Sequence, residues 1–165
     1  MTVEDSPEAQ VKARLRRYSD LLDEIDMQRQ RLDRMRAECG SPRSPRYDGM
    51  PKAKGSDPDW VHREAMMIIR LEERVADDEA REAEERRDLE RMVSKVPRAM
   101  ERAVLRMRYF DRCDWEWIAF AVYGDKEDYF DRADEYRQRV YRRHSDAVLS
   151  LALVDADEAI VRRSA

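Results

Sequence analysis

The segment from 137 to 143 carries side chains whose chemistry suits a nucleic acid. Its sequence, RQRVYRR, contains four arginines and no acidic residue. At helical spacing one face of the segment presents Arg137, Gln138, Tyr141 and Arg142. Guanidinium and amide groups on such a face can form hydrogen bonds with base edges in a major groove. The other interpretation of the same residues is an ordinary solvated helix face.

Other arginines near this face could contact the backbone of a nucleic acid. We expect Arg139 and Arg143 to reach phosphates, which position a protein without reading base sequence. Four more arginines precede the segment and could add phosphate contacts, although each taken singly is more simply a surface charge. They are Arg98, Arg102, Arg106 and Arg108.

Three helices within residues 97–153 are predicted to position these side chains. The first covers residues 98–109, with an apolar stripe of Met100, Val104, Leu105 and Met107. Asp114 is placed to cap the second helix, and Gly124 to end it with a positive φ. The inward face of this second helix holds Ile118, Ala119 and Val122. The third helix buries a stripe of Val140, Ala147, Val148 and Leu151. Together they predict a small helix-turn-helix domain.

An acidic segment separates the second and third of these helices. Residues 125–135 (DKEDYFDRADE) hold six acids and two bases, a net charge of −4. One interpretation is an extra helical turn whose Tyr129 and Phe130 pack on the domain. The alternative is an acidic cover close to the arginine face.

Two long helices are predicted to precede this domain. Residues 1–5 are expected to be disordered, and Ser6-Pro7 should start a helix that ends near Cys39-Gly40. Its heptad seam is Val11, Leu15, Tyr18, Leu22, Ile25 and Leu32, with Arg29 at one seam position. Residues 40–58 form a loop that holds four of the six prolines and three of the four glycines. The second helix should begin near residues 56–58 and end before Pro97.

The second long helix keeps a heptad phase only at its two ends. Its apolar seam positions are Ile68, Leu71, Val75, Leu89, Met92 and Val96. Acidic residues take the middle seam positions, where we expect a solvated helix with local ion pairs: Asp78, Glu82 and Glu85. We predict that residues 6–96 form an antiparallel coiled-coil hairpin within one chain, although a homodimer would satisfy the same seams.

Composition narrows the class of protein. The predicted fold is all-α, with the hairpin, the helix-turn-helix domain at 97–153 and a tail at 154–165.

A net charge of −4 among 42% charged residues means that any DNA binding must rely on local charge. No nucleophile–base spacing, phosphate loop or metal-ligand cluster is recognisable, so we predict no enzyme activity, no cofactor and no metal. Two distant cysteines fit a reducing cytoplasm, and no apolar run has membrane-spanning length.

Several single residues are better explained by packing than by chemistry. His144 and His62 stand alone, so each is expected to be a hydrogen-bonded structural histidine rather than a metal ligand. Trp115 and Trp117 are expected to be core residues. An apolar patch at residues 66–69 (MMII) fits either the core between the long helices or a dimer surface.

The order of these motifs resembles a known family. A long helix, a loop with SPxSP and GMP, a charged helix, and then CDWEWIA and RVYRRH are similar to the RinA/ArpU-type phage transcriptional activators. The resemblance covers roughly residues 11–151 and implies a domain similar to sigma factor region 4. It implies double-stranded DNA and bacterial RNA polymerase as partners, activation of phage late genes, and action in the host cytoplasm. The acidic segment at 125–135 and Arg143, at a position that is usually apolar, depart from the family pattern.

Two other functions remain open from the sequence. Small terminase subunits also combine a helix-turn-helix with long helices, but they assemble as rings on DNA packaging sites. A coiled-coil adaptor or structural protein, whose helical head binds protein instead of DNA, would carry the same long helices.

Overall fold

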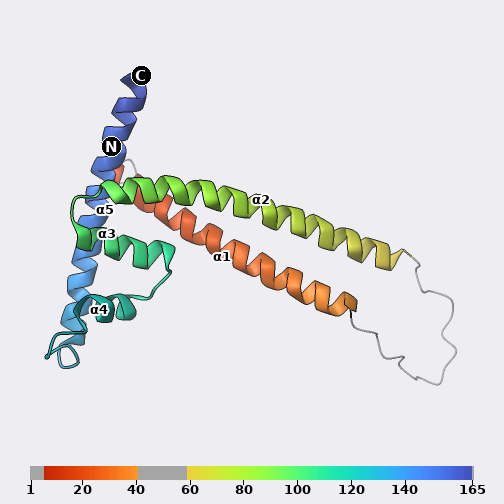
Figure 1. The fold of residues 1–165 in the computed structure, drawn as a ribbon, viewed down its shortest axis with the longest axis horizontal. Coiled ribbons are helices and arrows are strands. Elements are labelled where there is room, and N and C mark those ends of the chain that lie inside the picture. Colours follow the sequence, from red (N-terminus) through yellow and green to blue (C-terminus); the bar gives the residue numbers. More distant parts are fainter. Residues whose placement is uncertain (1–5, 41–58, 165) are drawn as a thin grey trace. The chain divides into compact units, whose positions relative to one another are not determined.

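The protein is all-α, as the sequence predicts. The computed structural model describes residues 6–40 and 59–164 (Figure 1). Its elements in chain order are α1 (Pro7–Gly40), α2 (Trp60–Lys95), α3 (Ala99–Leu105), the π-helical turn η2 (Arg106–Phe110), α4 (Trp115–Tyr123) and α5 (Ala133–Ser164). The predictions of a disordered N-terminus and of a proline-rich loop lie outside the described residues.

Helices α1 and α2 pack antiparallel as a hairpin, which confirms the predicted architecture (Figure 1). Ser6 caps α1 as expected, since its hydroxyl oxygen accepts a hydrogen bond from the Ala9 amide at 3.1 Å. Helix α2 ends at Lys95, two residues before Pro97. The start of α1 and the end of α2 therefore lie where Ser6 and Pro97 predict them.

The chain divides into two compact units, which we describe separately. The hairpin unit is Leu21–Arg81, and the head unit combines residues 6–20 with residues 82–164. In the hairpin unit, Leu32, Leu71 and Val75 form a small core. Two ion pairs link its helices, Arg29 with Glu79 and Arg36 with Glu72, each at 2.6 Å. Seam contacts and charge pairs thus hold the unit together.

The acidic seam residues of α2 are less solvated than the sequence predicts, although local ion pairs of the predicted kind occur, such as Arg81 with Asp78 at 2.7 Å. In the hairpin unit, Asp78 is buried and accepts a hydrogen bond from Gln28 at 3.2 Å. In the head unit, Tyr18 donates to Glu82 at 2.6 Å. The Arg14 guanidinium donates to both oxygens of Glu85 at 2.6 and 3.0 Å. Each acid meets a donor on α1, because a buried carboxylate needs hydrogen-bond partners. In each unit, polar pairs therefore take these seam positions.

Helices α3, α4 and α5 pack against one another in the head unit. Their shared core contains Val104, Ile118, Ala119, Tyr129, Tyr136 and Val140. The inward stripe predicted for α5 is confirmed, since all four of its residues are buried. An edge-to-face contact at 5.6 Å between Tyr18 and Phe110 joins α1 to η2. Residues 6–20 and the C-terminal helices therefore fold as one core.

The inward face of α3 differs from the predicted stripe at one position. Met100 is exposed, whereas the neighbouring Glu101 is only 1% exposed. Glu101 accepts hydrogen bonds from Ser150 at 2.9 Å and from Arg98 at 3.1 Å. Because both carboxylate oxygens have donors, the buried acid is tolerated and links α3 to α5.

Two helix ends also differ from expectation. Gly124 has a φ of −60°, so it does not supply the predicted positive φ. A Cβ atom at this position would lie 2.5 Å from the Phe120 carbonyl oxygen and 2.9 Å from the Phe120 ring, so close approach is what favours glycine. At the C-terminus, α5 continues to Ser164 instead of ending near Leu153.

Candidate nucleic-acid interface

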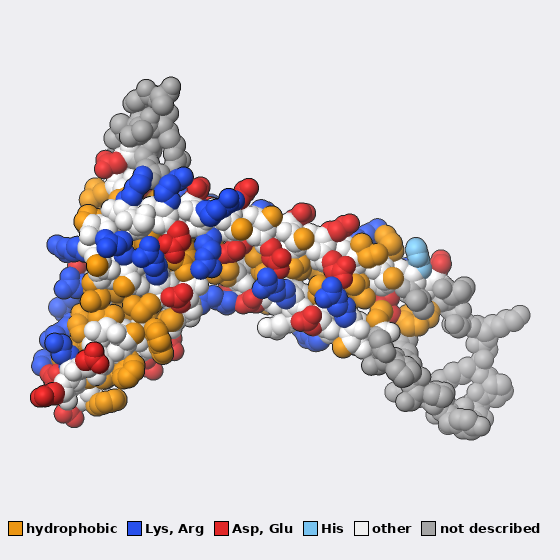
Figure 2. Space-filling view, in the orientation of Figure 1, with side chains coloured by type: hydrophobic (Ala, Val, Ile, Leu, Met, Phe, Trp, Pro, Cys, Tyr) orange, Lys and Arg blue, Asp and Glu red, His pale blue; other side chains and the backbone are white. Residues whose placement is uncertain are grey.

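The predicted recognition residues all lie on the first half of α5. Gln138, Arg139, Arg142 and Arg143 are exposed, and Arg137 and Tyr141 are partly buried. Lys and Arg side chains gather along the outer edge of this helix (Figure 2). The buried stripe on the opposite side fixes the rotation of α5, so the predicted face points away from the core.

Two carboxylates hold Arg137, from two different helices. Its Nη1 donates to Glu116 of α4 at 3.0 Å, and its Nη2 donates to Asp134 in the first turn of α5. Both acids are well exposed, so solvent screens these pairs and each contributes little to stability. Their effect is on position, because they orient the guanidinium at the start of the candidate face.

A shallow hollow of about 470 Å³ opens between the start of α4 and the candidate face. The residues that line it are Asp114, Trp115, Glu116, Arg137, Gln138 and Tyr141. Asp114 caps α4 as predicted, since its carboxylate accepts the Trp117 amide at 2.7 Å. The Tyr141 ring stands edge-on to Trp115 at 5.0 Å. The cap fixes the start of α4, and the aromatic pair joins α4 to α5 at the site.

The acidic segment before α5 forms turns from residue 124 to 132, and two of its acids, Asp128 and Glu135, share Arg132 as a partner. Asp128 accepts hydrogen bonds from Tyr136 at 2.7 Å and from Arg132 at 3.0 Å. The bond from the Tyr136 hydroxyl is the main cause that holds the pKa of Asp128 below its ordinary value. Arg132 likewise lowers the pKa of Glu135 through a hydrogen bond at 2.5 Å.

The aromatic residues of that segment behave differently from each other. Tyr129 is buried in the head core, as one of the two interpretations expects. Phe130 is 81% exposed, so the prediction that it packs on the domain is wrong.

Four arginines with predicted phosphate contacts instead hold the head unit together. Arg98 pairs with Glu101, and Arg106 pairs with Glu90 at 3.1 Å. The Arg102 guanidinium donates to the backbone carbonyl of Val96 at 2.6 Å. Arg108 donates to the Cys113 carbonyl at 3.0 Å, and its Cζ lies 4.6 Å from the centre of the Trp115 ring. Each of the four thus has a partner within the head unit, and its contact with a phosphate stays a prediction.

His144 is the structural histidine that the sequence predicts. It is buried, and its Nε2 lies 3.0 Å from the Tyr109 hydroxyl. Its ring stands edge-on to Trp115 at 5.0 Å. Burial lowers the pKa of His144 to about 4, with smaller contributions from Lys12 and Arg108. Among the residues that the structure describes, no group of three or more His, Cys, Asp or Glu side chains could hold a metal ion.

Sequence reasoning missed an exposed aromatic surface on the head unit. Trp115 packs against the core as predicted, but Trp117 is 53% exposed and Phe120 is 52% exposed. With Phe130 these residues form what we call the aromatic ridge, defined as Trp117, Phe120 and Phe130. Tyr129 connects it, because its ring lies 5.7 Å from Phe120 and 5.5 Å from Phe130. The sequence does carry a signal for this surface. Trp117 and Phe120 are three residues apart, so they share a side of α4 that differs from the side of the inward-facing Ile118.

Comparisons of the chain with protein-family models, curated proteins and solved structures find no match. Within residues 6–40 and 59–164, no helix is long and apolar enough to cross a membrane.

Proposed function

We propose that this chain is a sequence-specific DNA-binding transcriptional regulator. The observation that carries the proposal is the outward face of α5, where Gln138 and Arg142 are exposed beside Arg137 and Tyr141. An α-helix with its side chains is about 10–12 Å wide, which matches a major groove of about 12 Å. Arg and Gln are the side chains that most often form paired hydrogen bonds with guanine and adenine.

The flanking residues support the same proposal. Arg139 and Arg143 lie beside this face, where they would reach phosphates on either side of the groove. Arg139 is partly fixed, because its Cζ lies 4.8 Å from the centre of the Tyr136 ring. The face therefore combines side chains suited to base edges with side chains suited to the backbone.

The connection between α4 and α5 is longer than a tight helix-turn-helix turn. Nine residues, 124–132, form turns between the two helices. Tyr129 packs this connection into the core, so α4 and α5 still contact each other. The head unit would therefore present α5 to DNA with a longer connection than a tight helix-turn-helix has, and Glu116 and Asp134 would lie near the edge of the groove.

The resemblance to the RinA/ArpU-type activators extends the proposal to its biological setting. On that basis the protein would activate phage late genes together with bacterial RNA polymerase in the host cytoplasm. A small terminase-like packaging subunit is the alternative within the DNA-binding class, and ring-sized oligomers on DNA would favour it.

The test is selection of bound DNA by the purified full chain, followed by titrations with the selected site. Arg142→Ala should weaken specific binding by about 1–3 kcal/mol and relax discrimination at one base position. Arg143→Ala should weaken binding to all sequences and reduce the dependence on salt. Arg17→Ala is the matched control, since Arg17 is an exposed arginine on α1. No selection of DNA, or equal affinity in the Arg142 variant and the control, would contradict the proposal.

A further inference from the structure

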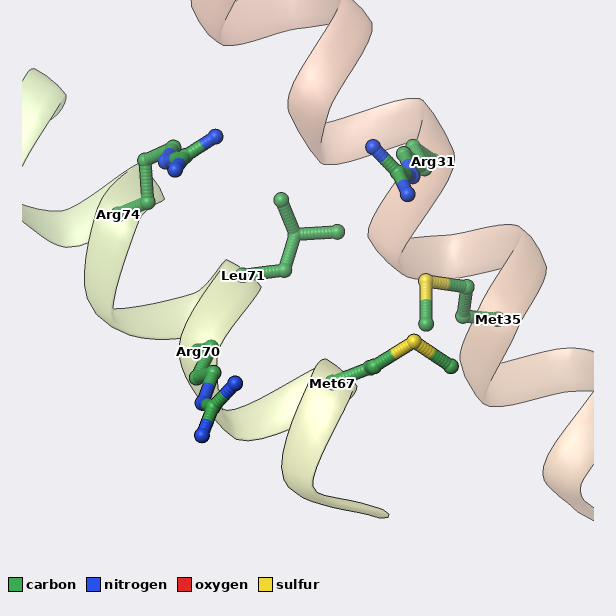
Figure 3. A pocket seen from close by; sticks show the side chains of 6 residues that line it. All are labelled: Arg31, Met35, Met67, Arg70, Leu71 and Arg74. Carbon is green, nitrogen blue, oxygen red and sulfur yellow. The ribbon is translucent and has the colours of Figure 1, made fainter. Parts of the chain in front are cut away.

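The hairpin unit contains an apolar slot with an arginine rim. Its volume is about 150 Å³, and the lining residues are Arg31, Met35, Met67, Arg70, Leu71 and Arg74. Met35 and Met67 reach toward each other from α1 and α2, and Leu71 lies between the two helices above them (Figure 3). The guanidinium groups of Arg31 and Arg74 stand around Leu71 (Figure 3). We call this feature the methionine–arginine slot.

The arginines on the rim of the slot differ from neighbouring arginines in their ion pairing. Elsewhere in the hairpin unit Arg29 and Arg36 pair with acids on α2. Among the described residues none of the three rim arginines takes part in an ion pair; these are Arg31, Arg70 and Arg74. A second slot cannot be the occupant, because two such rims would place like charges together. The chemical complement of the slot is instead an apolar group flanked by acidic residues.

The same chain carries such a group on the head unit. Phe130 is the most exposed large hydrophobic residue among the described residues, at 81%. Exposed acids stand close to it in the sequence, at Asp125, Glu127 and Asp131. Apolar side chains gather in the part of the head unit that contains α4 (Figure 2). The aromatic ridge with its acidic surroundings is thus the chemical complement of the slot.

Size and chemistry support the match between Phe130 and the slot. Apolar cavities of about 150 Å³ are large enough to bind a benzene ring. Methionine sulfur makes favourable contacts with aromatic rings, and arginine does so through cation–π contacts. Arginine and carboxylate groups that flank such a contact would add charge-assisted hydrogen bonds.

We propose that a second copy of this chain inserts Phe130 into the methionine–arginine slot, with Glu127 and Asp131 facing the rim arginines. Each chain supplies one aromatic group and one slot, so a single contact needs one group from each of two copies. The proposal concerns surfaces other than the outward face of α5. It does not depend on DNA binding, and either proposal can fail alone.

The test is sedimentation velocity and light scattering on the full chain over a wide range of protein concentration. The parent should associate, and added salt should weaken the association. Phe130→Ser and Met67→Glu should each weaken it by about tenfold or more, the loss typical of a central interface residue. Leu149→Ser and Met27→Glu are matched controls, because both positions are exposed and lie outside the ridge and the slot. Circular dichroism would establish that all variants keep their helices.

Mixing the two defective variants gives the decisive result. The Phe130→Ser chain keeps an intact slot, and the Met67→Glu chain keeps an intact Phe130, so a mixture should associate more strongly than either variant alone. Arg70→Glu combined with Asp131→Arg should likewise associate more strongly than either single charge reversal. A parent that stays monomeric, a Phe130→Ser chain that associates like the parent, or a mixture without recovery would overturn the proposal.

Discussion

Protonation of His144 should make stability depend on pH in a defined range. Burial is the largest cause that lowers the pKa of this imidazole, from 6.5 to about 4. Lys12 and Arg108 lower it further, since a positive charge on the ring would face theirs. The folded protein therefore holds His144 neutral, with its Nε2 against the Tyr109 hydroxyl.

The sign and size of the effect follow from proton linkage. Between pH 6.5 and 4 the unfolded chain binds a proton at this residue that the folded chain does not. The stability contribution is thus fully present above pH 6.5 and is lost as the pH falls toward 4. The difference between the two pKa values corresponds to about 3 kcal/mol, because one pKa unit equals about 1.4 kcal/mol.

Denaturant unfolding at several pH values would measure this loss. The parent should carry His62→Gln, so that His144 is the chain's only imidazole, and should be compared with the same chain carrying His144→Gln as well. The parent should lose about 3 kcal/mol more than the His144→Gln chain between pH 6.5 and 4. Tyr109→Phe should keep most of this difference, since burial is the main cause. Parallel pH curves for the parent and the His144→Gln chain would refute the argument.

Two further predictions concern the candidate interface and its support. Replacing Glu116 by Gln and Asp134 by Asn should tighten the binding of random-sequence duplex DNA several-fold at low salt. The reason is that the two carboxylates no longer hold Arg137 or repel phosphates. Gel-shift titrations at increasing salt should show that this gain in affinity fades. The same gain in an Asp23→Asn control on the hairpin unit would contradict the local explanation. Gly124→Ala should lower stability by about 1–3 kcal/mol in thermal unfolding, because its Cβ would meet the Phe120 carbonyl; an unchanged midpoint would show that the turn relaxes without cost.

Local signals in the sequence sufficed for most of the backbone. The heptad seams predict the hairpin because two apolar stripes must cover each other, and Ser6 and Asp114 mark helix starts through their side-chain oxygens. The inward stripe of α5 is apolar at a helical period, so burial of one face determines which arginines point outward. Those arginines were identifiable for that reason, while their role in binding stays a prediction.

The remaining features depend on specific contacts that residue type alone does not reveal. Glu82 appears solvated until Tyr18, which is far away in the sequence, is placed against it. Glu101 is an unlikely core residue by composition, and only Ser150 and Arg98 make its burial tolerable. Gly124 is constrained by the Phe120 carbonyl rather than by its own φ. In each instance pairwise geometry outweighs a rule based on residue type.

The acids around α5 bear on how a chain with net charge −4 could bind DNA selectively. Glu116 and Asp134 already hold the guanidinium of Arg137, so a phosphate must compete with two carboxylates for the same donors. Non-specific DNA offers only such phosphates, whereas a cognate site would also bond with Gln138 and Arg142. Replacing the carboxylates around Arg137 by a phosphate is therefore least favourable on DNA that offers no base contacts to offset the cost. The acidic residues would lower non-specific affinity more than specific affinity, which is a gain in selectivity obtained from surface charge alone.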